Sequence, residues 1–129
     1  MTAGIEVATA RVPSDGGHVR TGEPWGVDVV RPTDGPALAT LFDGCSAETV
    51  YRRFFGQPSA LPPQYRAAVL GGHPDVHDAV VVRYGDRLHV AGLASLATLR
   101  QGAQPAELGV LVVDAWQGRG LGTAMVDAL

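Results

Sequence analysis

A glycine-rich segment near the end of the sequence, Gln117-Gly118-Arg119-Gly120-Leu121-Gly122, carries its strongest chemical signal. It follows an apolar run and opens a segment with apolar residues at helical spacing, so it predicts a turn from a strand into a helix. At such a turn backbone N–H groups can converge on a phosphate, and the helix N-terminus favours an anion by about 0.3 to 1 kcal/mol. Arg119 adds a positive charge. We therefore expect this segment to bind a phosphate-bearing ligand.

Two other interpretations of this segment stay open. A dinucleotide-binding fold also uses a strand, a turn and a helix, but the Gly-x-Gly-x-x-Gly spacing and an acidic partner for the ribose are both missing. The second alternative is a tight turn with a purely structural role.

The block from Val112 to Gly122 resembles the acetyl-CoA motif of the GNAT acetyltransferases, which is Gln/Arg-x-x-Gly-x-Gly/Ala after a strand. Gln117, Gly120 and Gly122 occupy the defining positions of that motif. The resemblance implies an α/β (α+β) fold of the GNAT-like acyl-CoA N-acyltransferase type. In that fold a mixed, mostly antiparallel sheet is flanked by helices.

The resemblance also implies acetyl-CoA as the co-substrate. Backbone groups of the strand would pair with the pantetheine arm, and amides of the turn would bind the pyrophosphate. The residues implied are Val110, Leu111 and Val112 in the strand, and Gln117, Gly118, Arg119, Gly120, Leu121, Gly122 and Thr123 in the turn and helix.

A second segment, Ser46 to Phe55, resembles a helix of the Pat-like protein lysine acetyltransferases, a branch of the GNAT family. This likeness implies a protein lysine as the acceptor of the acetyl group, with a small-molecule amine as an alternative. Tyr51 and Phe54 are equally compatible with simple packing of the helix on the sheet.

A lysine acceptor requires a base. The lysine pKa is about 10.4, so presenting the neutral amine at pH 7 costs on the order of 4 to 5 kcal/mol. Glu107 begins the strand that leads to the turn, and it resembles the catalytic glutamate of Pat-like and other GNAT enzymes. We expect it to take the amine proton while the amine attacks the thioester directly, although an exposed strand-end charge is the other interpretation. No catalytic or metal-binding role is expected for Asp78, Asp114, His73, His77 or His89.

Hydrophobic periodicity and turn residues predict the elements that position these residues. Three helices are expected between the first strand and the others, with Arg52 and Arg53 in solvent on the second. Trp116 should pack beneath the glycine turn. The predicted segments are a strand over 26–31, helices starting at Thr33 or Asp34, at Ser46 and at Pro62-Pro63, a hairpin of strands from Ala79 and from Leu88, a strand over about 107–113, and a final helix ending at Leu129.

The composition is that of one globular domain, since 46% of the 129 residues are hydrophobic and 18% are charged. A net charge of −3 gives no general attraction for nucleic acid, no apolar run is long enough for a membrane span, and a cytoplasmic location is expected. The single cysteine, Cys45, has no disulfide partner in the chain and is expected to be buried.

The predicted domain organisation is a flexible arm over residues 1–25 followed by the N-terminal portion of a GNAT domain over 26–129. In the family, further strands and a tyrosine that protonates the departing thiolate follow this portion. We therefore expect a sheet that lacks its C-terminal strands and that could associate with a second copy or swap domains through the open edge. A non-catalytic acyl-CoA-binding module and an inactive fragment remain alternatives to the enzyme.

Overall fold

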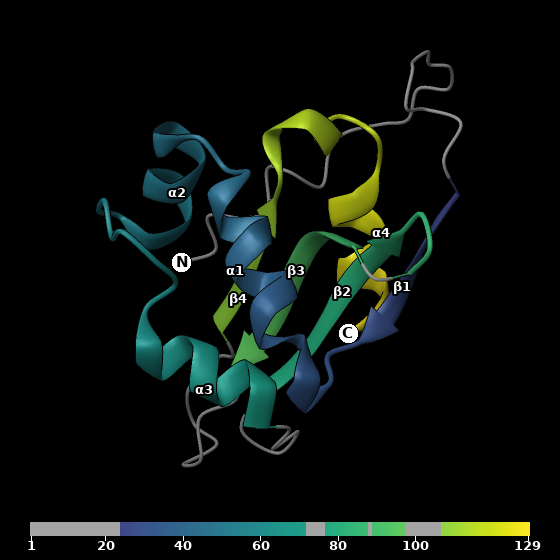
Figure 1. The fold of residues 1–129 in the computed structure, drawn as a ribbon, viewed down its shortest axis with the longest axis horizontal. Helices are drawn as coiled ribbons and strands as arrows, with labels where there is room; N and C mark the ends of the chain where they lie inside the picture. The colour runs from purple at the N-terminus through teal and green to yellow at the C-terminus, as the bar shows by residue number, and fades with distance from the viewer. Residues whose placement is uncertain (1–23, 72–76, 88, 98–106) are drawn as a thin grey trace.

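The structure is a computed structural model that describes residues 24–71, 77–87, 89–97 and 107–129. Within these residues, four strands form one antiparallel sheet in the order β1-β2-β3-β4 (Figure 1). Each strand therefore lies beside its neighbour in the sequence, and β1 and β4 form the two edges. The strands are β1 (Trp25–Val29), β2 (His77–Tyr84), β3 (His89–Ala97) and β4 (Glu107–Val112).

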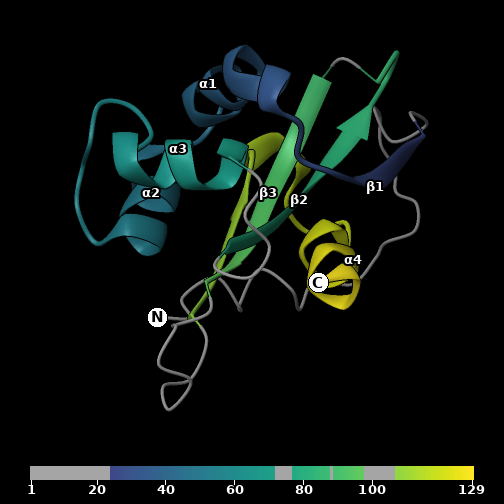
Figure 2. The same cartoon turned by 90° about the horizontal axis from the view of Figure 1, so that it is seen from below.

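Helices cover both faces of the sheet. Figure 2 shows α1, α2 and α3 on one face and α4 on the other. The helices are α1 (Gly35–Asp43), α2 (Ala47–Phe54), α3 (Pro63–Gly71) and α4 (Leu121–Ala128), and short 3-10 turns, η3 (Pro32–Asp34) and η4 (Asp114–Trp116), precede α1 and α4.

Alternation of side chains along the strands creates two separate cores. Val81, Leu93 and Leu111 lie in register and pack beneath α1, α2 and α3. Val82 and Val110 face the opposite side and pack against α4. The sheet is thus buried on both faces, which explains why its strands read as nearly continuous apolar runs.

The predicted order of elements, one strand, three helices, three strands and one helix, is confirmed. The predicted fold is confirmed as well, except that the sheet is entirely antiparallel among the described strands rather than mixed. β1 begins at Trp25, one residue earlier than expected, and ends at Val29. It ends early because the Arg31 amide donates to the Asp34 carboxylate, at 2.7 Å, as the chain enters η3.

Capping differs between the first two helices. Ser46 caps α2 as predicted, because its hydroxyl accepts a hydrogen bond from the Thr49 amide at 3.2 Å. Asp34 occupies the cap position of α1 but makes no side-chain cap bond, since its carboxylate pairs with Arg83 instead.

Tyr51 on α2 was a candidate for packing against the sheet. That expectation is wrong, since 53% of its surface is exposed to solvent.

Most of the arm predicted over residues 1–25 lies outside the described residues, and its length and mobility stay predictions. In the described part of the chain, no helix is long and apolar enough to cross a membrane.

Candidate functional site

The predicted phosphate-binding segment forms an open turn between β4 and α4. Gly118 and Gly120 both have left-handed backbone conformations, with φ of 81° and 90°, and Gly120 is the residue before the first turn of α4. Only glycine adopts such angles without strain. A Cβ built at either position would meet nothing within 4 Å, so the space above the turn is open. A ligand can therefore approach the backbone directly.

The N-terminus of α4 points its amides at this space. The first backbone bond of the helix runs from the Ala124 amide to the Gly120 carbonyl, at 3.1 Å. The amides of Leu121 and Gly122 come before that bond and have no acceptor one turn back in the helix. These amides, together with the positive end of the helix dipole, suit a bound phosphate.

Trp116 supports the turn from below, as the sequence predicted. Its side chain is only 5% exposed and packs against Tyr84 with 4.5 Å between ring centroids. The Arg119 guanidinium lies over the indole, 5.0 Å from its centroid. The indole thus holds a cation beside the glycine turn.

Hydrogen bonds connect the segment between β4 and α4 to the start of α2. The Gln117 side-chain amide donates to the Val112 carbonyl at 3.0 Å and to the Thr49 hydroxyl at 3.2 Å. The Asp114 carboxylate accepts a hydrogen bond from the Ser46 amide at 2.9 Å. Burial alone would raise the pKa of Asp114, but the hydrogen bonds from Ser46 and Thr49 lower it below its ordinary value. The Asp114 carboxylate therefore joins the start of α2 to the segment that leads into the turn.

Beside the turn, β4 exposes one edge of its backbone. Among the described strands it pairs only with β3, with Leu111 opposite Leu93 and Val110 opposite Ala94. The side chains of Val110, Leu111 and Val112 are buried. The Val113 amide donates to the Ala91 carbonyl, so in this register Leu111 directs its backbone groups at β3, and Val110 and Val112 direct theirs at the open edge. Of the three residues predicted to contact a cofactor, only Val110 and Val112 can therefore do so through the backbone of this edge.

The other end of β4 borders a cavity of about 300 Å³. Glu107, the predicted base, is exposed at the first residue of the strand and lines this cavity with Gly109. Val112 lies five positions after Glu107, a span of about 17 Å in a β-strand. One strand thus connects a carboxylate in a cavity with a glycine turn at a helix N-terminus. The rest of the lining comes from α2, from the start of α3 and from β3, namely Arg53, Phe54, Pro62, Gln64, Tyr65, Ser95 and Ala97.

Arg53 was predicted to lie in solvent, and that prediction is wrong. The side chain is half-buried, and its guanidinium lies 4.6 Å from the Phe54 ring centroid and 4.7 Å from that of Tyr65. Arg52, by contrast, is exposed and pairs with Glu48 at 2.7 Å. The overlooked sequence signal is Gly109, because an isolated glycine inside an apolar strand often marks close approach of another group to the backbone.

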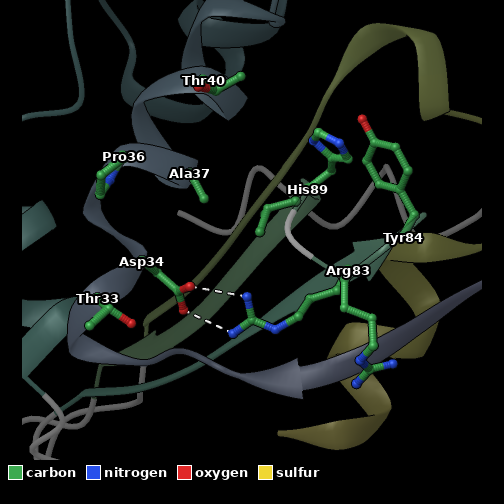
Figure 3. A pocket seen from close by; sticks show the side chains of 10 residues that line it. Thr33, Asp34, Pro36, Ala37, Thr40, Arg83, Tyr84 and His89 are labelled. Carbon is green, nitrogen blue, oxygen red and sulfur yellow. Dashed lines mark hydrogen bonds and ion pairs between the residues drawn. The ribbon is translucent and has the colours of Figure 1, made fainter.

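A second cavity, of about 400 Å³, lies between α1 and the β2–β3 hairpin. Figure 3 shows Arg83 turned toward Asp34 in this cavity. The Arg83 side chain is 5% exposed and pairs with Asp34 at 2.9 Å and with Asp28 at 2.8 Å. Burial would raise the pKa of Asp34, but hydrogen bonds from Arg83 and the Arg31 amide lower it. These pairs join β1, η3 and β2, so the polar groups here hold the fold together.

Cys45 is partly buried and donates a weak hydrogen bond to the Leu41 carbonyl, with 3.4 Å between sulfur and oxygen. Burial, together with the nearby Asp114 carboxylate, raises the pKa of the thiol to about 12. The thiolate is therefore scarce at neutral pH, and Cys45 is not a suitable nucleophile.

Comparison with solved structures decides the fold. The GNAT domain of S. lividans PAT superposes with a TM-score of 0.70 at 20% identity, over 86% of this chain and 71% of that one. An acetyltransferase from Thermus thermophilus gives a TM-score of 0.58 at 21% identity, over 81% of this chain and 66% of that one. A probable acetyltransferase gives 0.53 at 21% identity, over 78% of this chain and 56% of that one.

The chain has the GNAT fold. The sequence itself matches no protein-family model and no curated protein. The likeness is therefore one of three-dimensional structure, and the chain spans between 56% and 71% of the length of these three GNAT neighbours. The roles expected for Glu107 and for the residues of β4 and the turn remain predictions about this GNAT fold.

Proposed function

We propose that the protein is an N-acetyltransferase that moves an acetyl group from acetyl-CoA to an amine, with a protein lysine as the acceptor. The observation that carries this proposal is the arrangement of β4. A carboxylate stands in a cavity at the start of this strand, and an open glycine turn at the N-terminus of α4 follows its end.

In this proposal the cofactor lies along the open edge of β4. Its pyrophosphate is held by amides of the turn and the start of α4, with Arg119 nearby. The pantetheine arm pairs with the outward-facing backbone groups of Val110 and Val112 and runs toward Glu107. A long extended arm suits this path, because about 17 Å of strand separates the two ends.

The chemical step needs no covalent intermediate on the enzyme. The amine nitrogen attacks the thioester carbonyl carbon, a C–N bond forms, and the C–S bond breaks to release CoA as its thiolate. Glu107 accepts the proton that the amine loses, directly or through one water. A backbone N–H of β4 stabilises the negative charge that develops on the carbonyl oxygen.

Two observations support a protein acceptor. Tyr51 on α2 and Phe55, the residue that follows the helix, are 53% and 66% exposed, and exposed aromatic side chains favour contact with a partner. One of the structural neighbours carries the PAT name, which is the branch that the α2 sequence resembles.

The proposal is tested at Gly120 with two substitutions that differ only in charge. Asparagine and aspartate both tolerate a left-handed backbone better than other side chains and are nearly equal in size. A Cβ at this position meets no neighbour. We expect Gly120→Asp to weaken acetyl-CoA binding at least tenfold more than Gly120→Asn does, because its carboxylate repels the pyrophosphate.

Binding is measured by titration calorimetry, and transfer by mass change of a lysine peptide. Equal affinities in the two variants would reject the turn as a pyrophosphate site. Acetyl-CoA binding without transfer to any peptide or small amine would instead favour a non-catalytic acyl-CoA-binding module.

A further inference from the structure

Arg53 places a cation in the wall of the cavity that Glu107 also lines. No carboxylate among the described residues pairs with it, whereas the adjacent Arg52 pairs with Glu48. Its Nε atom is buried and has no hydrogen-bond partner. Leaving such a donor unsatisfied costs about 1 to 3 kcal/mol, and more for a charged group. The positive charge of the Arg53 guanidinium thus has no counter-charge among the described residues.

The neighbours of Arg53 hold its guanidinium in place without neutralising it. The rings of Phe54 and Tyr65 contact it at 4.6 and 4.7 Å between the guanidinium carbon and the ring centroids. The Tyr65 hydroxyl is in turn 2.7 Å from the Ser95 hydroxyl, which fixes the ring. An aromatic face attracts a cation but leaves the N–H groups at the guanidinium edge free for an acceptor.

The Arg53 guanidinium packs against β4 at Gly109, which has no side chain to exclude it. A Cβ built at Gly109 would overlap the Nε, Cζ and Nη2 atoms of Arg53. Glycine inside a strand weakens the strand, and it commonly marks a site where another group approaches the backbone. Arg53 thus lies directly against the same strand that begins with Glu107.

From these contacts we propose that the cavity binds an acceptor that carries a carboxylate close to its amine, and that Arg53 recognises this carboxylate. The inference rests on the proposed acetyl transfer. The two charges of the cavity are of opposite sign, so they match a substrate with both an amine and an anion. The amine goes to Glu107 and the carboxylate to the planar, bidentate guanidinium. The carboxylate comes either from the substrate's own α-carboxyl group or from an acidic residue beside a lysine in a polypeptide.

The test uses two pairs of acceptors that all present the same ε-amine. One pair is Nα-acetyl-lysine and its C-terminal amide. The other pair is the blocked peptides acetyl-Gly-Lys-Glu-amide and acetyl-Gly-Lys-Gln-amide. We expect the charged member of at least one pair to have a kcat/KM at least tenfold above its neutral partner. The pair that responds identifies the source of the carboxylate.

The variants assign this preference to Arg53. In Arg53→Gln the charged-to-neutral ratio should fall below about twofold, whereas Arg52→Gln, which removes an equal charge one residue away in solvent, should keep the ratio of the wild type. Arg53→Lys keeps the charge but loses the planar guanidinium that binds a carboxylate with two hydrogen bonds, so its charged-to-neutral ratio should lie between those of the wild type and Arg53→Gln. If Arg53→Gln does not fold, the ratio of Arg53→Lys is compared with that of the wild type in its place.

Direct binding separates failure of this inference from failure of the proposed function. The same four acceptors are titrated by NMR without acetyl-CoA, and the same preference for a carboxylate is expected. If no acceptor is acetylated but this preference holds, the proposed function fails and the anion site stands. A ratio near one for both pairs in the wild type, or a ratio that persists in Arg53→Gln, would overturn the inference.

Discussion

Glu107 combines two properties that a general base needs. It is exposed at the start of β4, and it lines a cavity that has room for an amine. The carboxylate forms no ion pair with any residue that the structure describes, so no internal cation competes with an incoming ammonium group. At the scale of single residues, the proton transfer in the proposed chemistry therefore depends on this carboxylate.

Glu107→Gln removes the proton acceptor while keeping nearly the same shape. We expect kcat for acetyl transfer to fall by roughly 10² to 10⁴, the usual contribution of a positioned base. Acetyl-CoA affinity should change by less than about twofold, because the turn lies at the other end of β4. The rate of the variant should recover as pH rises toward the lysine pKa of about 10.4, since the neutral amine is then supplied by the solvent.

Steady-state kinetics between pH 6 and about 10 check this expectation. Glu48→Gln is the matched control, because Glu48 is an exposed glutamate that pairs with Arg52 on the surface of α2. An unchanged kcat in Glu107→Gln would remove Glu107 from the mechanism.

At the scale of elements, α2 connects the two halves of the site. Its first turn is bonded to the glycine turn through Asp114 and Gln117. Its last turn places Arg53 and Phe54 in the cavity. A change in the position of α2 therefore alters both the proposed cofactor contacts and the proposed acceptor contacts.

Ser46→Ala tests this connection, because it removes the cap of α2. We expect the free energy of unfolding to fall by about 1 kcal/mol, the usual cost of losing a serine N-cap. The KM for acetyl-CoA should rise, since the start of α2 holds the glycine turn through the Ser46 amide, which donates to Asp114, and the Thr49 hydroxyl, which accepts from Gln117. Ser46→Asn keeps a capping group and should retain most of the stability. Urea unfolding and kinetics of the three proteins give the result, and equal stability of all three would contradict it.

The elements were largely predictable because their signals are local. The Val-rich runs of β2 and β4, the Ser46 cap and the glycine turn each depend on a few consecutive residues. Arg53 was placed wrongly because its surroundings are assembled from α3 and β4, which are distant in the sequence. The helical pattern of the segment places Arg53 on the polar face. It cannot show that Gly109, 56 positions later in the sequence, leaves room for the guanidinium against β4. Likewise, Asp34 looked like a cap because Arg83 was not visible as its partner.

At the scale of the whole molecule, a single buried cation joins the first strand to the rest of the sheet. Arg83 on β2 binds Asp28 of β1 and Asp34 of η3. It also donates to the Val29 carbonyl at 2.9 Å. β1 is a short edge strand, so these contacts supplement the hydrogen bonds that hold it to β2.

The stability of the fold should depend on pH through Asp34. The pKa of Asp34 is lower in the folded protein than its value of about 3.9 in an unfolded chain. The carboxylate therefore stabilises the fold fully above about pH 4 to 5, and this contribution is lost as pH falls through the folded-state pKa. Asp34→Asn should cost up to about 3 kcal/mol at neutral pH, because it removes one of the two carboxylates that pair with the buried Arg83 charge and leaves only Asp28.

The difference between wild type and Asp34→Asn should shrink as the pH falls below about 4, since protonation also neutralises the wild-type carboxyl. Urea unfolding of both proteins from neutral pH down to about pH 3 measures this difference, with the exposed Asp43→Asn as the control. The control should follow the wild type throughout, because Asp43 forms no ion pair with the described residues. A difference for Asp34→Asn that stays constant through this range would mean that Asp34 stabilises the fold by packing and not by its charge.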